Sequence, residues 1–533
     1  MSNEYIKMNR LYISFLLIVG VFSIGTAQDY VNQKFDRQFI LMPRLGEACD
    51  NLDTSNHVYI NATLLDFNTD SLQMSPLDTF APDKPVPYFT INQCAEICDR
   101  QGRIAAYFNG ADLWDRNKHS QPVEVFRHAS SWGPFQLSYL INSCLMLPIP
   151  SRENHFVIIG PTKFQYEPDT NYRAEAGTQI SAAYFRQDTV DGSLGIYRVD
   201  SNLHAAKYVF SGAMTACRHS NGRDWWIACP ERFGKIFHLF LLTPDGLIYS
   251  HDSEVSDLIY DFSIAPMFSP DGRYYTRTDV ITIDQYRKKN YVQIFGFDRC
   301  TGMFSDPVSF QLPQEDTSSI GQAIFDASSR YLYLTSCASL FQVDMQASDI
   351  PGSLIKVSGY DRSIIDQLSY LCIGFGILAP DGKMYFADGR NSYRMTVVNN
   401  PSAPGLACDA RYAAIMKPSC FGGAWGNMPD YNLGPLDGSP CDTLGLDAVS
   451  LHRPEKSSRL EIAPSPTRGE FTVWLPSQEG RLSITDMQGI HIRQIPIERY
   501  AMEQRVILPR GIYLLTYQSA DGRIRASGKV VVF

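Results

Sequence analysis

Three observations predict an all-β protein, built as a β-propeller of six to eight blades followed by a small C-terminal β-sandwich. A turn followed by an aromatic, β-rich strand recurs through the middle of the chain at intervals of 50 to 69 residues. The composition includes 12% aromatic residues, 37 Gly and 31 Pro, which favours short strands and many turns over helices. The stretch 459–533 consists of short alternating strands separated by turn signals, the pattern of a small sandwich.

The first 27 residues predict a secretory signal peptide. Lys7 and Arg10 precede an apolar run from Leu11 to Ile24, and small residues follow it. A basic start, an apolar region of about 7–15 residues and a small-residue cleavage point define such a signal. A membrane-spanning helix needs about 20 apolar residues, and no second run exists. We therefore expect residues 1–27 to be removed on export, with no transmembrane anchor.

The central repeat predicts the propeller. Its turns lie 51, 69, 50, 57 and 53 residues apart, at Gly102, Glu153, Gly222, Gly272, Ser329 and Gly382. A period near 50 residues made of about four strands is typical of propeller blades, whereas two stacked sandwiches would not explain the regular spacing. The longest interval holds an extra turn at Asp191-Gly192, which fits a longer outer hairpin.

Six turns predict at least six blades in a propeller spanning 80–431. The segments Phe39–Pro43 and Gly423–Tyr431 can supply strands for a further blade, which would close the ring by pairing the two ends of the domain. We favour seven blades, with six or eight as alternatives. The segment 28–79 would then lead into the propeller or close it.

One turn carries a candidate binding site, in the sequence RHSNGRDWW. His219, Arg223, Asp224 and Trp225 can form a rim loop with acid–base groups beside an aromatic platform suited to sugars. The alternative interpretation is a hairpin turn whose tryptophans pack between blades. Adjacent strand residues point to opposite faces, so Trp225 and Trp226 cannot share one packing layer.

A candidate calcium site lies in the sequence NGADLWDRN. Asn109, Asp112 and Asp115 offer oxygen ligands, although their order differs from that of an EF-hand and such residues also form turns. No other cofactor is indicated. The acidic stretch from Asp252 to Asp261 is expected to be a solvated loop.

Twelve cysteines in an exported chain predict disulfides, because the cell exterior is oxidising. Cys217 and Cys229 flank the RHSNGRDWW hairpin and are candidates for one bridge. Cys408 and Cys420 bracket a short loop and are candidates for another. The full connectivity is not determined by the spacing.

Charge and motifs limit the function. The formal net charge of −9 argues against a nucleic-acid partner, which requires clustered Lys and Arg. The chain contains no G-x-S-x-G, H-E-x-x-H, Walker or G-x-G-x-x-G motif in a suitable setting. This favours a binding or interaction protein that grips a glycan or a protein. The alternative is a secreted enzyme that degrades polysaccharide or peptide, which needs titratable side chains converging at the mouth of the channel.

The C-terminal stretch 459–533 carries an ordered set of motifs. They are a Pro-x-Pro start with Ser465 between the prolines, a Gly-x-hydrophobic strand, a D-x-x-G hairpin, an L-P-x-G-I-Y strand and a hydrophobic final strand. Together they resemble the type A C-terminal sorting domain of the type IX secretion system of Bacteroidota. The resemblance implies secretion or surface display by way of the periplasm, with the type IX machinery as partner. A linker rich in Gly, Pro and Ser, 432–458, is expected to separate this domain from the propeller.

A second resemblance covers the segment 80–447. Its CDRQGRIAAYFNGADLWDRN, ACRHSNGRDWWIA and PDYNLGPLDGSPCD segments are similar to those of exported propeller proteins of Bacteroidota. Members of that family have no agreed activity, so the resemblance implies fold and location and leaves the chemistry open.

Overall fold

The structure is a computed structural model of the 533-residue chain. The residues that it describes are 34–41, 62–69, 71–77, 95–127, 144–166, 175–210, 214–231, 234–256, 266–282, 288–313, 320–336, 338–359, 373–388, 392–421, 428–444, 458–475, 479–486, 490–498, 501, 503–519 and 525–533. The predicted signal peptide lies outside them. The chain divides into two compact units, Met1–Asp442 and Thr443–Phe533.

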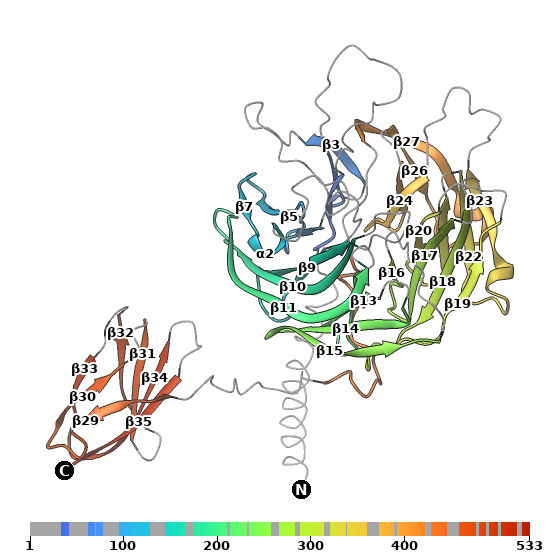
Figure 1. Cartoon of the computed structure of the whole chain (residues 1–533). Coiled ribbons are helices and arrows are strands. Elements are labelled where there is room, and N and C mark those ends of the chain that lie inside the picture. Colours follow the sequence, from blue (N-terminus) through green and yellow to red (C-terminus); the bar gives the residue numbers. More distant parts are fainter. Residues whose placement is uncertain are drawn as a thin grey trace, which may run out of the picture. The chain divides into compact units, whose positions relative to one another are not determined.

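The described part of the first unit contains seven antiparallel sheets, numbered here in chain order (Figure 1). Sheet 1 has three strands: β1 (Gln38–Leu41), β2 (Ala62–Asp66) and β3 (Gln73–Leu77). Sheet 2 contains β4 (Ala95–Cys98), β5 (Ile104–Phe108), β6 (Asp112–Asp115) and β7 (Ser120–Pro122). Sheet 3 contains β8 (Leu145–Pro148), β9 (His155–Tyr166), β10 (Glu175–Gln187) and β11 (Leu194–Phe210).

Four more four-stranded sheets follow. Sheet 4 contains β12 (Thr215–Arg218), β13 (Trp225–Pro230), β14 (Ile236–Thr243) and β15 (Gly246–Glu254). Sheet 5 contains β16 (Met267–Phe268), β17 (Tyr274–Thr282), β18 (Lys288–Gly296) and β19 (Val308–Gln311). Sheet 6 contains β20 (Ile320–Phe325), β21 (Tyr331–Ser336), β22 (Ser339–Asp344) and β23 (Ile355–Gly359). Sheet 7 contains β24 (Ile373–Leu378), β25 (Met384–Asp388), β26 (Ser392–Val398) and β27 (Ala410–Phe421).

Helices are short in the described residues. They are α2 (Glu124–Arg127) and the 3-10 turns η2 (Pro351–Ser353) and η4 (Gly405–Cys408). None of the described helices has the length and apolar character needed to cross a membrane. The prediction of an almost entirely β protein built from small antiparallel sheets is confirmed.

Each sheet of the first unit packs against the next one in the chain. Contacts join β4 to β8, β11 to β13, β12 to β16, β17 to β20 and β20 to β24. Strand β27 of sheet 7 contacts β2 and β3 of sheet 1, and β1 contacts β4 of sheet 2 (Figure 1). Both faces of an inner strand are therefore covered, which explains why the strands β12, β13 and β21 are buried along their whole length.

Strand β13 illustrates this packing. Trp225 and Ile227 belong to a core cluster shared with sheets 2 and 3, while Trp226 and Ala228 belong to one shared with sheet 5. The period of two along a strand divides the residues between the two faces. The predicted separation of Trp225 from Trp226 is confirmed.

The repeated turns join the first and second strands of sheets 2 to 7. Five of these turns are closed by a backbone hydrogen bond between residues three positions apart in the chain. The N–H donors and carbonyl acceptors are Gly102 and Asp99, Gly222 and His219, Gly272 and Ser269, Ser329 and Asp326, and Gly382 and Ala379. These five donor residues have φ between 60° and 80°. Glycine adopts this left-handed backbone without steric cost, which accounts for its recurrence in the repeat.

The sequence predicts that the two ends of the first unit pair in one blade, and the described strands do not pair in this way. Sheet 1 takes all three of its described strands from the N-terminal segment. The described residues 428–431 form no strand. The C-terminal end of the first unit instead packs against the turns of sheets 4 and 5.

The second unit contains two sheets in its described part. One has the order β28 (Ser458–Arg459), β35 (Arg525–Val532), β34 (Gly511–Ser519), β31 (Gly480–Asp486) and β32 (His491–Ile497). The other has the order β29 (Glu461–Ala463), β30 (Glu470–Trp474) and β33 (Glu503–Ile507). Alternate residues of β30, β31 and β34 meet in a core of this unit's own, which includes Phe471, Leu482 and Leu515.

Candidate functional site

A segment that we call the strap, residues 428–442, contacts strand β8 of sheet 3 and the turns of sheets 4 and 5. The hydroxyl of Tyr431 donates to the carbonyl of Met146 (3.1 Å), and the Leu436 N–H donates to the carbonyl of Ser220 (2.9 Å). A disulfide joins Cys441 of the strap to Cys300 of sheet 5. The segment 432–458, predicted as a linker, thus packs on the first unit through residue 442.

The predicted binding residues lie beneath this strap. His219 is 2% exposed, Asp224 is 5% exposed and Trp225 is fully buried. The structure brings His219, Arg223, Asp224 and Trp225 together in one turn, yet three of them are closed off from solvent.

Several polar side chains of this turn bond to one another. The Asp224 carboxylate accepts from Asn221 Nδ2 (2.8 Å) and from Arg223 Nε (2.8 Å), and the Asn221 N–H donates to His219 Nδ1 (3.0 Å). Burial lowers the pKa of His219, so its imidazole is held neutral as an acceptor. These contacts, together with the two tryptophans packed in the core clusters, are those of the alternative interpretation, a hairpin turn whose tryptophans pack between sheets.

Two buried arginines fix the strap to the turn. The Arg299 guanidinium donates to the carbonyls of Arg218 (2.9 Å), His219 (3.2 Å) and Gly434. The Arg218 guanidinium lies 3.8 Å from the Trp225 ring centroid and donates to the carbonyl of Arg223 (2.7 Å). Such planar groups, each with several N–H donors, satisfy buried carbonyls that a shorter side chain would leave unpaired.

Two carboxyl groups come close to one another at the strap. Burial and the nearby Asp430 raise the pKa of Asp36 to about 6. Asp430 keeps an exposed surface, but the protein atoms around it also raise its pKa by desolvation. Asn432 of the strap donates to Asp36 (3.3 Å). Carboxyl groups with raised pKa values are candidates for a functional site, and the sequence, in which they lie far apart, does not associate them.

A cavity of about 220 Å³ lies beside the strap. Its walls come from the turn of sheet 3 and from neighbouring elements: Phe35, Arg100, Pro148, Ile149, Pro150, Ser151, Arg152, Glu153, Asn154, His155, Phe156 and Arg218. Arg100 and Glu153 form an ion pair (2.6 Å) in which both side chains are at least half exposed. The cavity combines apolar walls with charged groups, which is the make-up of a small binding site.

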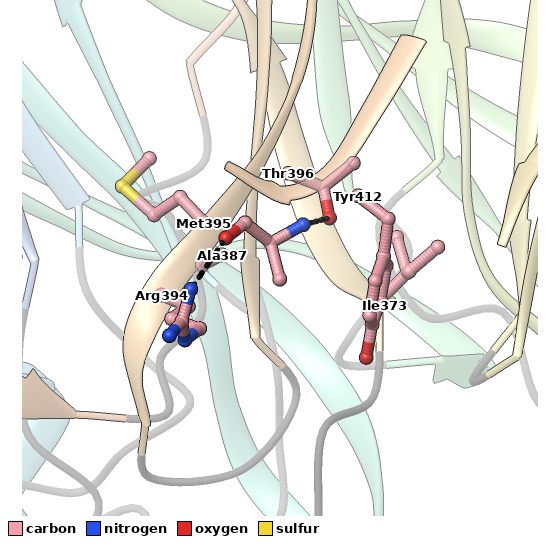
Figure 2. A pocket seen from close by; sticks show the side chains of 7 residues that line it. Ile373, Ala387, Arg394, Met395, Thr396 and Tyr412 are labelled. Atoms are coloured by element: carbon pink, nitrogen blue, oxygen red, sulfur yellow. Dashed lines mark hydrogen bonds between the residues drawn. The ribbon is translucent and has the colours of Figure 1, made fainter. Parts of the chain in front are cut away.

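A second recess, in sheet 7, is too small to bind a ligand (Figure 2). Its volume is about 10 Å³, and it lies where the pairing of β26 with β27 shifts register. Ala413 has φ of 49° there, donates its N–H to Thr396 Oγ1 (3.1 Å) and accepts from Arg394 (3.2 Å). A space of this size holds at most one water molecule.

The candidate calcium ligands are engaged in turns. Asn109 Oδ1 accepts the N–H groups of Ala111 (3.0 Å) and Asp112 (2.7 Å). Asp115 Oδ1 accepts those of Asn117 (2.8 Å) and His119 (2.9 Å). Asp112 and Asp115 stand at opposite ends of β6, three residues and about 10 Å apart, on opposite faces of the strand. Their side chains do not converge on one ion.

The candidate local disulfides are not formed. Cys217, Cys229 and Cys408 are buried thiols, and the side chain of Cys420 lies outside the described residues. Cys217 pairs with Trp226 in the ladder, so Cys229, three residues further on, faces the opposite side of the sheet. The two sulfur atoms therefore belong to different core layers.

Comparisons with known proteins give only distant similarities. No protein-family model and no curated protein matches the chain. Among solved structures, the chain is similar to PorZ of Porphyromonas gingivalis, described as an essential bacterial surface component of the type-IX secretion system. The identity is 12% and the TM-score 0.34, over 89% of this chain and 63% of PorZ.

Two further structures show similarities of the same order. A functionally unknown protein of Desulfotomaculum acetoxidans has 9% identity and a TM-score of 0.32, over 61% of this chain and 90% of that protein. The β-propeller domain of Myceliophteria thermophila Cps50 (Swd1) has 14% identity and a TM-score of 0.27, over 69% of this chain and 95% of that domain. TM-scores this low carry no argument about function.

Proposed function

We propose that this chain is an exported binding protein. The first unit acts as a seven-bladed β-propeller displayed at the cell surface or released from it, and the second unit acts as the sorting domain that directs it through the type IX secretion system. The cavity beside the strap receives the ligand, a glycan or a protein segment.

The propeller assignment is supported by the order of contacts among the sheets. Six four-stranded sheets each pack on their neighbours, and sheet 1 contacts both sheet 7 and sheet 2. Seven successive sheets linked in this order are what a closed seven-bladed propeller requires.

Binding is favoured over catalysis by the residues of the first strands. The first strands of neighbouring sheets contact one another in sheets 2–3 and in sheets 4–7, so they line the centre of the unit. Within the described strands β4, β8, β12, β16, β20 and β24, Glu96 is the one carboxylate, and the other positions are mainly small or apolar. A hydrolase needs paired titratable groups converging there.

The sorting role is supported by the independence of the second unit. Its described strands share a core of their own, and Gly511, Ile512 and Tyr513 of the L-P-x-G-I-Y motif lie on strand β34. A unit with its own core can fold as a separate domain.

Deletion of residues 459–533 tests the sorting role. We expect the truncated chain to accumulate, folded, in the periplasm, whereas the full chain reaches the surface or the medium. Cell fractionation locates the protein, and protease resistance of the first unit reports whether that unit is folded. Transfer of 459–533 to an unrelated periplasmic protein should carry that protein outside. If the truncated chain still leaves the cell, the proposed sorting role is wrong.

The ligand is tested separately by a glycan array and a peptide array probed with the full secreted chain. Arg152→Ala removes a charge from the cavity wall, and Arg468→Ala in the second unit is the matched control. The site is supported if the parent and the control bind a ligand equally well and the Arg152→Ala variant binds it with at least tenfold lower affinity. Equal binding by all three proteins excludes the cavity as the binding site.

A further inference from the structure

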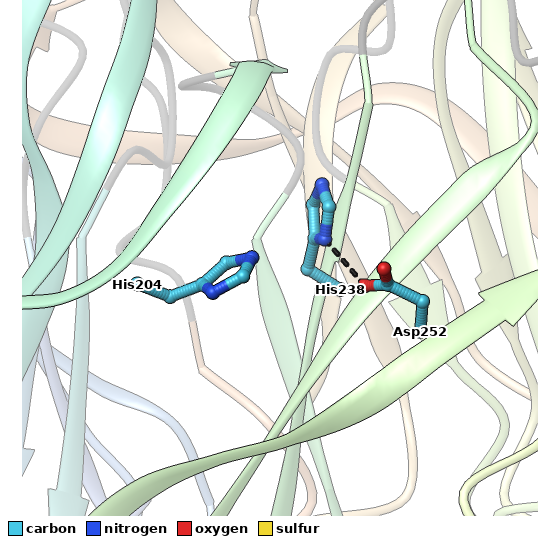
Figure 3. Close-up of side chains that lie close together, drawn as sticks. All are labelled: His204, His238 and Asp252. Atoms are coloured by element: carbon cyan, nitrogen blue, oxygen red, sulfur yellow. Dashed lines mark hydrogen bonds and ion pairs between the residues drawn. The ribbon is translucent and has the colours of Figure 1, made fainter.

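Three side chains that can bind metal meet between the outer strands of sheets 3 and 4. His204 lies on β11, His238 on β14 and Asp252 on β15 (Figure 3). One ligand atom from each side chain lies within 4.8 Å of those of the other two. His238 and Asp252 face each other directly in the ladder of β14 and β15, so the sheet itself fixes two of the three.

His238 is positioned as a metal-binding imidazole is. Its side chain is 5% exposed, and its Nδ1 lies 2.6 Å from Asp252 Oδ1. On the other side of the ring, Nε2 is buried without a hydrogen-bond partner and lies 3.5 Å from Glu231 Oε1. A metal-binding histidine commonly has a carboxylate facing its second nitrogen, which fixes the orientation and the tautomer of the ring.

His204 completes the set from the neighbouring sheet. Its ring stacks on Tyr249, with centroids 3.8 Å apart and an interplanar angle of 1°, and lies 5.1 Å from the His238 ring. An ion among the three side chains would bind one nitrogen atom of each imidazole.

The cluster is open on one side. The Asp252 side chain is 44% exposed, in contrast to the buried His238. An ion can therefore enter from solvent, and water can complete its coordination. The three residues are not among those that line the cavity described above, and their strands come from two different sheets.

We propose that His204, His238 and Asp252 bind a Zn²⁺ ion that joins sheet 3 to sheet 4, with Glu231 orienting His238. Two imidazole nitrogens and a carboxylate oxygen are a donor set that zinc favours, and water fills the remaining position. The ion adds a cross-link between two sheets that are already joined by packing and by hydrogen bonds from Leu247 N–H to Tyr184 Oη (2.9 Å) and from Arg198 to the carbonyl of Asp245 (2.8 Å). This inference does not depend on the proposed function.

Zinc titration of the full secreted chain, after removal of bound metal with a chelator, tests the site. We expect calorimetry to show one Zn²⁺ per chain and zinc to raise the melting temperature of the parent, since an ion that binds only the folded state stabilises it. His238→Ala and Asp252→Asn should each lower the affinity at least tenfold and abolish the thermal shift. Substitution of Co²⁺ should give visible absorption bands that the same variants lose.

Two further variants keep the test decisive. His251→Gln removes an imidazole from the residue next to Asp252, on the opposite side of β15 against Trp226, and should bind zinc as the parent does. His204→Gln, at a half-buried position, replaces His238→Ala if the latter fails to fold. Zinc binding that is equally strong in the parent and in the His204→Gln and Asp252→Asn variants would place the ion elsewhere. If the folded parent shows no saturable zinc binding, the proposal is wrong. The contact between His238 and Asp252 is then only a hydrogen bond within the sheet.

Discussion

Asp36 and Asp430 bring two carboxyl groups of like charge together at the strap. The pKa of Asp36 rises from 3.8 to about 6, because burial and then Asp430 disfavour its ionised form. The folded protein therefore holds the Asp36 proton more tightly than the unfolded chain does. The stability that this proton contributes is fully present below about pH 4 and is lost as the pH rises through 6.

Asp36→Asn should accordingly stabilise the protein at pH 8. The shift of about two pKa units corresponds to roughly 3 kcal/mol, so a gain of about 1–3 kcal/mol is expected for this partly exposed residue. At pH 4 the variant and the parent should have equal free energies of unfolding. Urea denaturation at both pH values measures the difference, and Asp437→Asn, at an exposed position of the strap, is the control. A gain of equal size at pH 4 and pH 8 would show that ionisation is not its cause.

At the scale of the element, the strap is held against a turn that has room only for glycine. Gly222 has φ of 68°, and a Cβ built on it would lie 2.5 Å from the backbone nitrogen of Pro435 in the strap. Gly382, in the equivalent turn of sheet 7, has φ of 79° but no atom within 4 Å of such a Cβ. Comparison of the two glycines therefore separates the free-energy cost of a left-handed backbone from the cost of a clash with the strap.

Gly222→Ala should therefore loosen the strap, whereas Gly382→Ala should not. Both changes place alanine in a left-handed conformation, at about 1–2 kcal/mol each. The additional clash at Gly222 has to be relieved by movement of the strap, since the nearest atoms are the backbone and the rigid ring of Pro435. Hydrogen exchange at the Leu436 amide, which bonds to Ser220, should quicken by an order of magnitude or more in Gly222→Ala alone. Equal exchange in the two variants would show that the turn does not hold the strap.

The outer strands show where local sequence reasoning is insufficient. The stretch beginning at Asp252 is predicted as a solvated loop because it is acidic, yet Asp252 lies in β15 opposite His238. His204 stands 34 residues before His238 in the sequence and reaches it only because two sheets pack side by side. A pattern of residues along the chain predicts hairpins, but contacts between sheets depend on the complete arrangement.

For the whole molecule, the sequence predicts the hairpins and sheets better than the contacts between segments that are distant in the chain. The repeated turns mark the hairpins of sheets 2 to 7, because positive φ at glycine is a local requirement. The two sheets of the second unit follow from alternation within 459–533. The strap and the second and third strands of sheet 1 are not predicted. The predicted residues of the RHSNGRDWW turn are covered by a segment more than 200 residues away.

The disulfide between Cys300 and Cys441 is the clearest case of such a connection. Candidate bridges chosen by spacing close short loops, whereas this one spans 141 residues and joins sheet 5 to the end of the strap. A cross-link over so long a loop restricts the unfolded chain strongly, and its loss costs about 2–5 kcal/mol. Replacement of both cysteines by serine should lower the melting temperature measured by calorimetry. Reductant should then affect the double variant less than the parent, because the described cysteines other than Cys300 and Cys441 form no bridge. A double variant as stable as the oxidised parent would show that packing alone holds the strap against the turns.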